Sequence, residues 1–94
     1  MKKSTIEIEF NPDSRLLLRA GWLAHEFLKT FKQDLGGVSL KPTRKANSFI
    51  LRVDEKEIWD LRLDGDLPRM KELKQLVREA ILSDPHHAQI EFNV

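Results

Sequence analysis

The chain has 94 residues, 40% of them hydrophobic and 33% charged, and its 16 basic and 15 acidic side chains leave a net charge of +1. This composition fits one small globular domain at residues 1–94, excludes a disordered chain, and gives no reason to expect nucleic acid or anionic lipid as the main partner. The absence of cysteine excludes disulfides and thiol redox chemistry by this chain's own side chains.

No long apolar run is present: runs such as Leu16–Leu18 are only three residues long. A signal peptide or a membrane-spanning helix needs a much longer apolar stretch. We therefore expect a cytoplasmic protein with no membrane partner.

The first predicted element is a half-buried strand at residues 5–10, where TIEIEF alternates apolar and polar side chains. Asn11 and Pro12 then favour a helix start, because asparagine is a preferred N-cap and proline is tolerated at the first helical position. Asp13 adds negative charge at the positive end of the helix dipole. The segment FNPDS is therefore predicted to join a strand to a helix.

A long amphipathic helix is expected next, with the Gly36-Gly37 pair at its C-terminal end. Its apolar stripe recurs at spacings of three, four and seven residues. Leu18 and Trp22 fall on the otherwise polar side, so we expect a binding partner, the loop after the second strand or the C-terminal tail to cover them. The stripe comprises Leu17, Ala20, Gly21, Ala24, Leu28, Phe31 and Leu35, widened by Leu16, Leu23 and Phe27.

The second half predicts a short strand, a hairpin and a helix. Residues 38–41 are the strand candidate, and residues 49–63 read as a hairpin around a turn at residues 54–57. Apart from the short strand candidate, the order is βα followed by ββα. The tail, residues 84–94, is a candidate edge strand or a flexible segment. The final helix starts near Pro68, ends before Ser83, and has a stripe of Met70, Leu73, Leu76, Val77, Ala80 and Ile81.

Residues 14–31, SRLLLRAGWLAHEFLKTF, resemble the opening helix of the Rdx family, the SelT/SelW/SelH group related to selenoprotein W. The resemblance continues through LGGVSLKP, IWD and LPRMKELKQLV, and it covers nearly all of residues 5–82. It implies a thioredoxin-like α/β (α+β) fold of βαββα type, in which two helices cover a mixed sheet. Leu16 departs from the tryptophan that many relatives have at this position.

In that family the redox motif, CxxC or CxxU with selenocysteine, lies between the first strand and the first helix. The resemblance places its two reactive positions at Asn11 and Ser14. An amide cannot ionise or exchange disulfides, and a serine hydroxyl stays protonated without a base. Asp13 would also repel an anion beside it. We therefore expect a bacterial-type member with no redox activity, no catalytic residue and no cofactor.

The expected function is a non-catalytic, protein-binding or structural domain. The resemblance adds residues 47–49 to its surface, because in thioredoxin-like folds the segment before the corresponding strand lies beside the redox loop. Two alternatives stay open: a glutathione-binding, transferase-like activity that uses the Ser14 hydroxyl, and a homodimer that pairs through residues 89–94. The predicted binding surface comprises Asn11, Pro12, Asp13, Ser14, Leu18, Trp22, Asn47, Ser48 and Phe49.

Metal and nucleic-acid sites are not expected. His86 and His87 are adjacent without metal-ligand spacing, and His25 lies on the polar side of the first helix. The small basic clusters lack the interleaved aromatic side chains of a nucleic-acid site. They comprise Lys2, Lys3, Lys41, Arg44 and Lys45.

Overall fold

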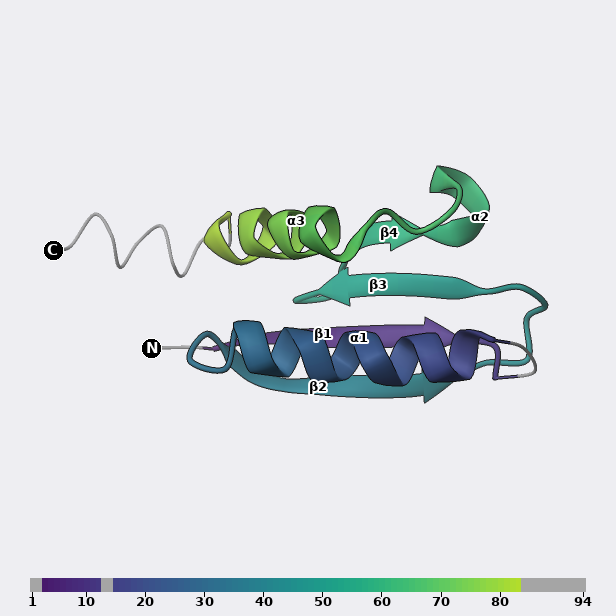
Figure 1. Ribbon diagram of the computed structural model, residues 1–94, viewed down its shortest axis with the longest axis horizontal. Helices are drawn as coiled ribbons and strands as arrows, with labels where there is room; N and C mark the ends of the chain where they lie inside the picture. The colour runs from purple at the N-terminus through teal and green to yellow at the C-terminus, as the bar shows by residue number, and fades with distance from the viewer. Residues whose placement is uncertain (1–2, 13–14, 84–94) are drawn as a thin grey trace, which may run out of the picture.

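A computed structural model of the chain describes residues 3–12 and 15–83 (Figure 1). Four strands and three helices follow one another in this part of the chain. They are β1 (Ser4–Phe10), α1 (Leu16–Thr30), β2 (Leu35–Pro42), β3 (Phe49–Val53), β4 (Lys56–Asp60), α2 (Leu61–Asp64) and α3 (Met70–Leu82).

The strands form one mixed sheet in the order β2-β1-β3-β4. Strand β1 pairs with β2 in parallel and with β3 antiparallel, and β3 pairs antiparallel with β4. Strands β1, β2 and β4 therefore end, and β3 begins, at the same end of the sheet, which we call the loop end. The mixed sheet and its helices confirm the predicted α+β, thioredoxin-like fold class, with one strand and one short helix more than the βαββα pattern contains.

The alternation predicted for β1 is confirmed. Ile6 and Ile8 are buried on the face that the helices cover. On the opposite face, Arg52 of β3 lies between two glutamates: its Nη1 is 2.8 Å from Glu7 Oε1 and 3.0 Å from Glu9 Oε1. One face of the sheet thus supplies the core and the other carries an ion-pair network.

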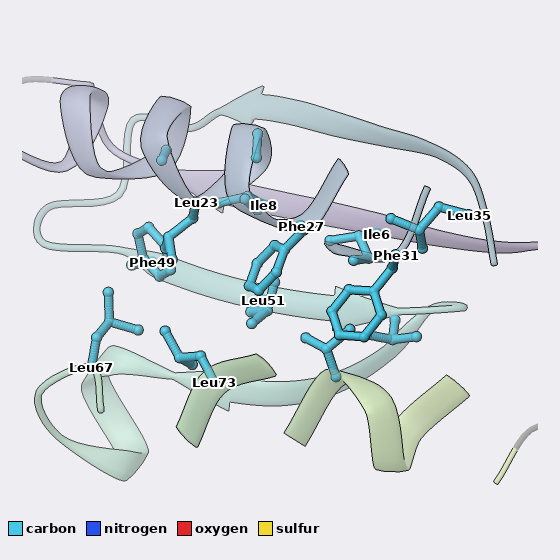
Figure 2. Packing of buried hydrophobic residues seen from close by; sticks show 14 of the residues in the cluster. Ile6, Ile8, Leu23, Phe27, Phe31, Leu35, Phe49, Leu51, Leu67 and Leu73 are labelled. Carbon is cyan, nitrogen blue, oxygen red and sulfur yellow. The ribbon is translucent and has the colours of Figure 1, made fainter. Parts of the chain in front are cut away.

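The core lies between this sheet and the helices α1 and α3 (Figure 2). Leu23 and Phe27 of α1 pack toward Leu51 of β3, and Leu73 comes from α3. The Phe31 ring follows the end of α1 and lies with its centroid 6.5 Å from that of Phe27. Burial of these side chains is what holds both helices on one face of the sheet.

The predicted bounds of the first helix were wrong at both ends. Helix α1 begins at Leu16 and not at Asn11, because Asn11 continues the pairing between the end of β1 and the residues before β3. The helix ends at Thr30, and Gly36-Gly37 belong to β2. Leu35 is buried as predicted, but it is buried from the start of β2.

The stripe on α1 is also rotated from the predicted one. Its buried residues are Ala20, Leu23, Ala24 and Phe27, whereas Gly21 is exposed. The two leucines at the edge of the stripe, Leu17 and Leu28, are half exposed. The helix therefore presents an apolar flank to solvent, which we describe below.

The hairpin is confirmed with a shorter turn than predicted. Asp54 and Glu55 form a two-residue turn, with φ of 50° and 72°. Residues 61–63, predicted as extended, instead belong to the short helix α2, because the Asp60 side chain accepts a hydrogen bond from Arg62 N–H at 2.9 Å and caps the helix.

Helix α3 confirms the second predicted stripe, with Leu73, Val77 and Ile81 buried. It ends at Leu82, before Ser83 as expected. The tail at residues 84–94 lies outside the described residues. Among the helices of residues 3–12 and 15–83, none combines the length and apolar content that a membrane span requires.

Candidate interaction site

The end of β1 is held between the loop after β2 and the residues before β3. Thr43 N–H donates to the Phe10 carbonyl at 2.8 Å, and Asn11 N–H donates to the Ser48 carbonyl at 2.9 Å. These bonds place the start of the 11–14 segment beside the residues that precede β3. The juxtaposition predicted from the family resemblance is therefore present at the loop end of the sheet.

Asn11 ties two segments of the loop end together. Its side chain is buried, and Nδ2 donates to the Lys45 carbonyl at 2.8 Å. With the main-chain bond to Ser48, the residue fixes the loop after β2 against the end of β1. A neutral amide used in this way is a structural group that carries no proton or electron chemistry.

Three side chains of the predicted binding surface are buried. Phe49 is 0% exposed and belongs to the core, and Ser48 and Asn11 are also buried. A partner that docks on this structure cannot contact these side chains extensively. Their contribution is to hold the neighbouring exposed residues in place.

The exposed part of the loop end is smaller than predicted. Pro12 and Asn47 are exposed, and Asn47 has a φ of 56°, in the left-handed region that asparagine tolerates better than most residues. Asp13 and Ser14 lie outside the described residues. The glutathione alternative, which uses Ser14, therefore stays a prediction.

Leu18 and Trp22 form an exposed apolar pair in the first half of α1. Leu18 is 82% exposed and Trp22 is 54% exposed, one helical turn apart. Polar residues surround them on this face, including His25 and Lys29, which are also exposed. The loop after β2 leaves the pair open, and the tail that could also cover it lies outside the described residues.

An ion pair anchors α1 beside Trp22. Lys74 Nζ of α3 lies 3.1 Å from Glu26 Oε1, and Glu26 follows Trp22 by one turn of α1. The hydrogen bond from Lys74 lowers the pKa of Glu26 below its usual value, against partial desolvation, and the positive charges of Lys74 and Lys29 lower it further. The Glu26–Lys74 ion pair thus connects α1 to α3 next to the exposed side chain of Trp22.

Comparison with known proteins gives the family. The profile of the Rdx family matches residues 5–79. The chain belongs to the Rdx family. The comparison with curated proteins gives no match.

Two crystal structures show how closely this Rdx chain follows known relatives. A protein from Bordetella parapertussis is 38% identical, with a TM-score of 0.78, over 84% of this chain and 99% of that protein. A selenoprotein W-related protein from Vibrio cholerae is 34% identical, with a TM-score of 0.79, over 85% of this chain and 99% of that protein. The similarity therefore spans nearly the whole of both relatives.

The chemistry open to this Rdx chain is limited by its side chains. It has no cysteine, and one of the two positions that the resemblance assigns to the redox pair is the buried amide of Asn11. Within residues 3–12 and 15–83, no group of three or more histidine or acidic side chains could hold a metal ion. His86 and His87 lie outside these ranges.

Sequence reasoning missed Leu63. It lies in α2, which follows β4 at the loop end of the sheet, and it is 81% exposed (Figure 1). The alternation of Leu61 and Leu63 resembled a strand, so no exposed position was expected there. Asp60 followed two residues later by Arg62 was an available signal, because aspartate is a preferred helix N-cap.

Proposed function

We propose that this chain is a non-catalytic Rdx-family domain that binds another protein through the Leu18–Trp22 pair. The observation that carries the proposal is the exposure of these two side chains on α1 in a chain that has no cysteine. Large apolar side chains on an otherwise polar face commonly mark a binding surface, and tryptophan is enriched among the residues that dominate interface energies.

The loss of redox activity is supported by the chemistry of the chain. Thiol–disulfide exchange needs a thiolate, and neither an amide nor a serine hydroxyl can replace it. Asn11 instead makes two hydrogen bonds that hold the loop end together. In this proposal the surface around Asn11 serves for contact and not for redox chemistry.

The Glu26–Lys74 ion pair supports a fixed geometry for this surface. It holds α1 against α3 one turn away from Trp22. A side chain presented on a held helix loses less conformational freedom on binding than one on a mobile loop. The proposal places the domain in the cytoplasm with a protein partner, and it includes neither nucleic acid nor a membrane.

Quantitative affinity capture tests the proposal. The full chain, the variants Leu18→Ala and Trp22→Ala, and the control Leu63→Ala are used as baits, and captured proteins are quantified by mass spectrometry. We expect specific partners to be retained by the wild type and the control and to fall about tenfold or more with Trp22→Ala, as for an interface hot spot.

Leu63→Ala is a matched control because Leu63 is as exposed as Leu18 and lies on another helix. Circular dichroism checks that all four proteins are folded. Equal recovery of every partner by the wild type and by both α1 variants would reject the Leu18–Trp22 pair as a binding site.

A further inference from the structure

Strand β2 has a long free edge. It is one of the two outer strands of the sheet and has eight residues, and no strand within the described ranges pairs with its outer side. Edge strands expose unpaired N–H and C=O groups that another strand can bind. Lys41 and Pro42 protect only the C-terminal end of β2, and a bulge near Gly36 protects only its beginning. The middle of the strand is therefore open to pairing.

The other outer strand, β4, is better protected. It has only five residues, begins with the charged pair Lys56-Glu57, and contains an irregular register against β3. Such features discourage pairing with another strand. Because β4 is protected and β2 is open, β2 is the edge at which a strand of another sheet would pair.

An uncharged flank of α1 lies above this edge. Helix α1 packs on β2 and β1, and its Glu26 side faces α3, so its opposite flank faces outward over β2 (Figure 1). Leu17 and Leu28 on this flank are 50% and 45% exposed, and Leu40 of β2, on the helix side of the sheet, is 44% exposed. Together with Gly21 they form what we call the β2 flank.

No contact among the described residues explains the glycine at position 21. It lies in the interior of α1, where glycine is less favourable than alanine. A Cβ atom at this position would meet no atom within 4 Å, so no contact of the described residues requires its absence. A small residue is needed there if another helix approaches closely.

We propose that the β2 flank binds a second copy of this chain about a two-fold axis, with the two β2 strands paired antiparallel into one continuous sheet. Side chains on the same face of two antiparallel strands must lie opposite each other, which restricts the register. With Ser39 on the axis, Val38 lies opposite the partner's Leu40, and the same pair forms again on the other side of the axis.

The charges agree with this register. Lys41 lies opposite the partner's Gly37, so no like charges face each other. The two Lys41 residues are separated by four strand positions, roughly 13 Å, which exceeds the screening length of about 8 Å at physiological ionic strength. The flank of α1 contributes no charge at Leu17, Gly21 and Leu28. An uncharged, self-complementary surface fits a second copy better than an acidic or basic partner.

The helix spacing agrees as well. Helix α1 lies over β1 and β2 and runs opposite to β2, so the two α1 helices would be antiparallel above the new strand pair. With strands about 4.8 Å apart, their axes would be roughly 10 Å apart, within the usual packing distance. Leu17 would then approach the partner's Leu28, and Gly21 the partner's Ala24.

The size of the contact sets its strength. The paired helices are 15 residues long, or about 22 Å, and only one strand and one helix flank of each copy take part. Such a contact lies toward the low end of protein interfaces, so we expect a dissociation constant in the micromolar range.

A single-cysteine variant tests the register without interference, because the chain has no native cysteine. Ser39→Cys places two sulfurs on the two-fold axis, where antiparallel Cα atoms are about 4.5–5.5 Å apart, within the disulfide range. We expect rapid air oxidation to a covalent dimer at micromolar protein. Lys41→Cys, on the same strand and face, is the control and should cross-link at least about tenfold more slowly, since its partner lies roughly 13 Å away.

Sedimentation equilibrium tests the surface independently. We expect wild type to dimerise, Leu28→Glu to raise the dissociation constant at least about tenfold, and the remote control Leu63→Glu, at a more exposed leucine on another helix, to leave it unchanged. Phe92→Lys should also leave the dissociation constant unchanged, because the proposed contact does not include the tail. A wild type that stays monomeric at several hundred micromolar, equal cross-linking of the two cysteine variants, or a dimer lost with Phe92→Lys but not with Leu28→Glu would overturn the proposal.

Discussion

Asn11 shows how one residue can serve structure at a position where relatives are expected to carry chemistry. Its Nδ2–H group donates to the Lys45 carbonyl at 2.8 Å from a buried position. We predict that Asn11→Ala lowers the free energy of unfolding by about 1–2 kcal/mol, because the 2.8 Å hydrogen bond is lost and the Lys45 carbonyl keeps only the longer bond, 3.3 Å, from Ser48 N–H. Urea unfolding followed by circular dichroism measures the change.

Lys45→Ala is the matched control for this prediction. The acceptor is the main-chain carbonyl of Lys45, which the substitution retains, and the side chain is exposed. Its stability should stay within about 0.5 kcal/mol of wild type. An Asn11→Ala variant as stable as this control would show that the bond contributes nothing measurable.

The errors in predicting individual residues share one physical cause. Asparagine favours both helix caps and loop ties, and glycine favours both helix C-termini and strand irregularities. At Asn11 and at Gly36-Gly37 the outcome depends on partners far along the chain: Ser48 for the first and β1 for the second. Local sequence does not contain that information.

The connection between α1 and α3 gives a pH-dependent prediction for these elements. The hydrogen bond from Lys74 lowers the pKa of Glu26 below its usual value of 4.5. A carboxylate with a depressed pKa in the folded state stabilises the fold above its unfolded pKa, and this contribution is lost as the pH falls through the folded pKa. We therefore predict that Lys74→Met is less stable than wild type at neutral pH.

The difference between wild type and Lys74→Met should shrink as the pH falls below 4.5, the usual pKa of Glu26, and should be lost once the pH is below its lower pKa in the folded state. Urea midpoints measured from acidic to neutral pH provide the test. Lys71→Met, on an exposed position of the same helix, should differ little from wild type at any pH. A deficit for Lys74→Met that is constant across this range would assign the effect to packing.

Periodic elements were easier to predict than irregular ones. The stripe of α3, the alternation of β1 and the hairpin all follow from patterns that are local in sequence. Helix α2 did not, because four residues are too few for a helical period and its cap at Asp60 decides the outcome. The stripe predicted for α1 was rotated from the observed one because it included Gly21 and Leu28, which are apolar but lie on the exposed flank of the helix.

For the whole molecule, the arrangement of the candidate site was predictable and its exposure was not. The family resemblance placed the residues before β3 beside Asn11, and helical periodicity placed Leu18 and Trp22 on the outer face. Phe49 was wrongly assigned to the surface because the family resemblance gave its position at the loop end but not the direction in which its side chain points. Strand alternation points it into the core, opposite Phe10 in the β1–β3 register.

A core substitution tests whether the described elements unfold together. The Leu51 side chain is fully buried in β3, in the cluster that α1 and α3 share. We predict that Leu51→Ala lowers the free energy of unfolding by about 2–5 kcal/mol, through lost burial and a residual cavity, out of the roughly 5–15 kcal/mol typical of a domain. Leu63→Ala, at an exposed position, should change it by at most about 0.5 kcal/mol.

Tryptophan fluorescence and far-ultraviolet circular dichroism should report the same midpoint for Leu51→Ala, because the loss of the Leu51 side chain affects one common core. Separate midpoints would mean that α1 or α3 leaves the sheet independently.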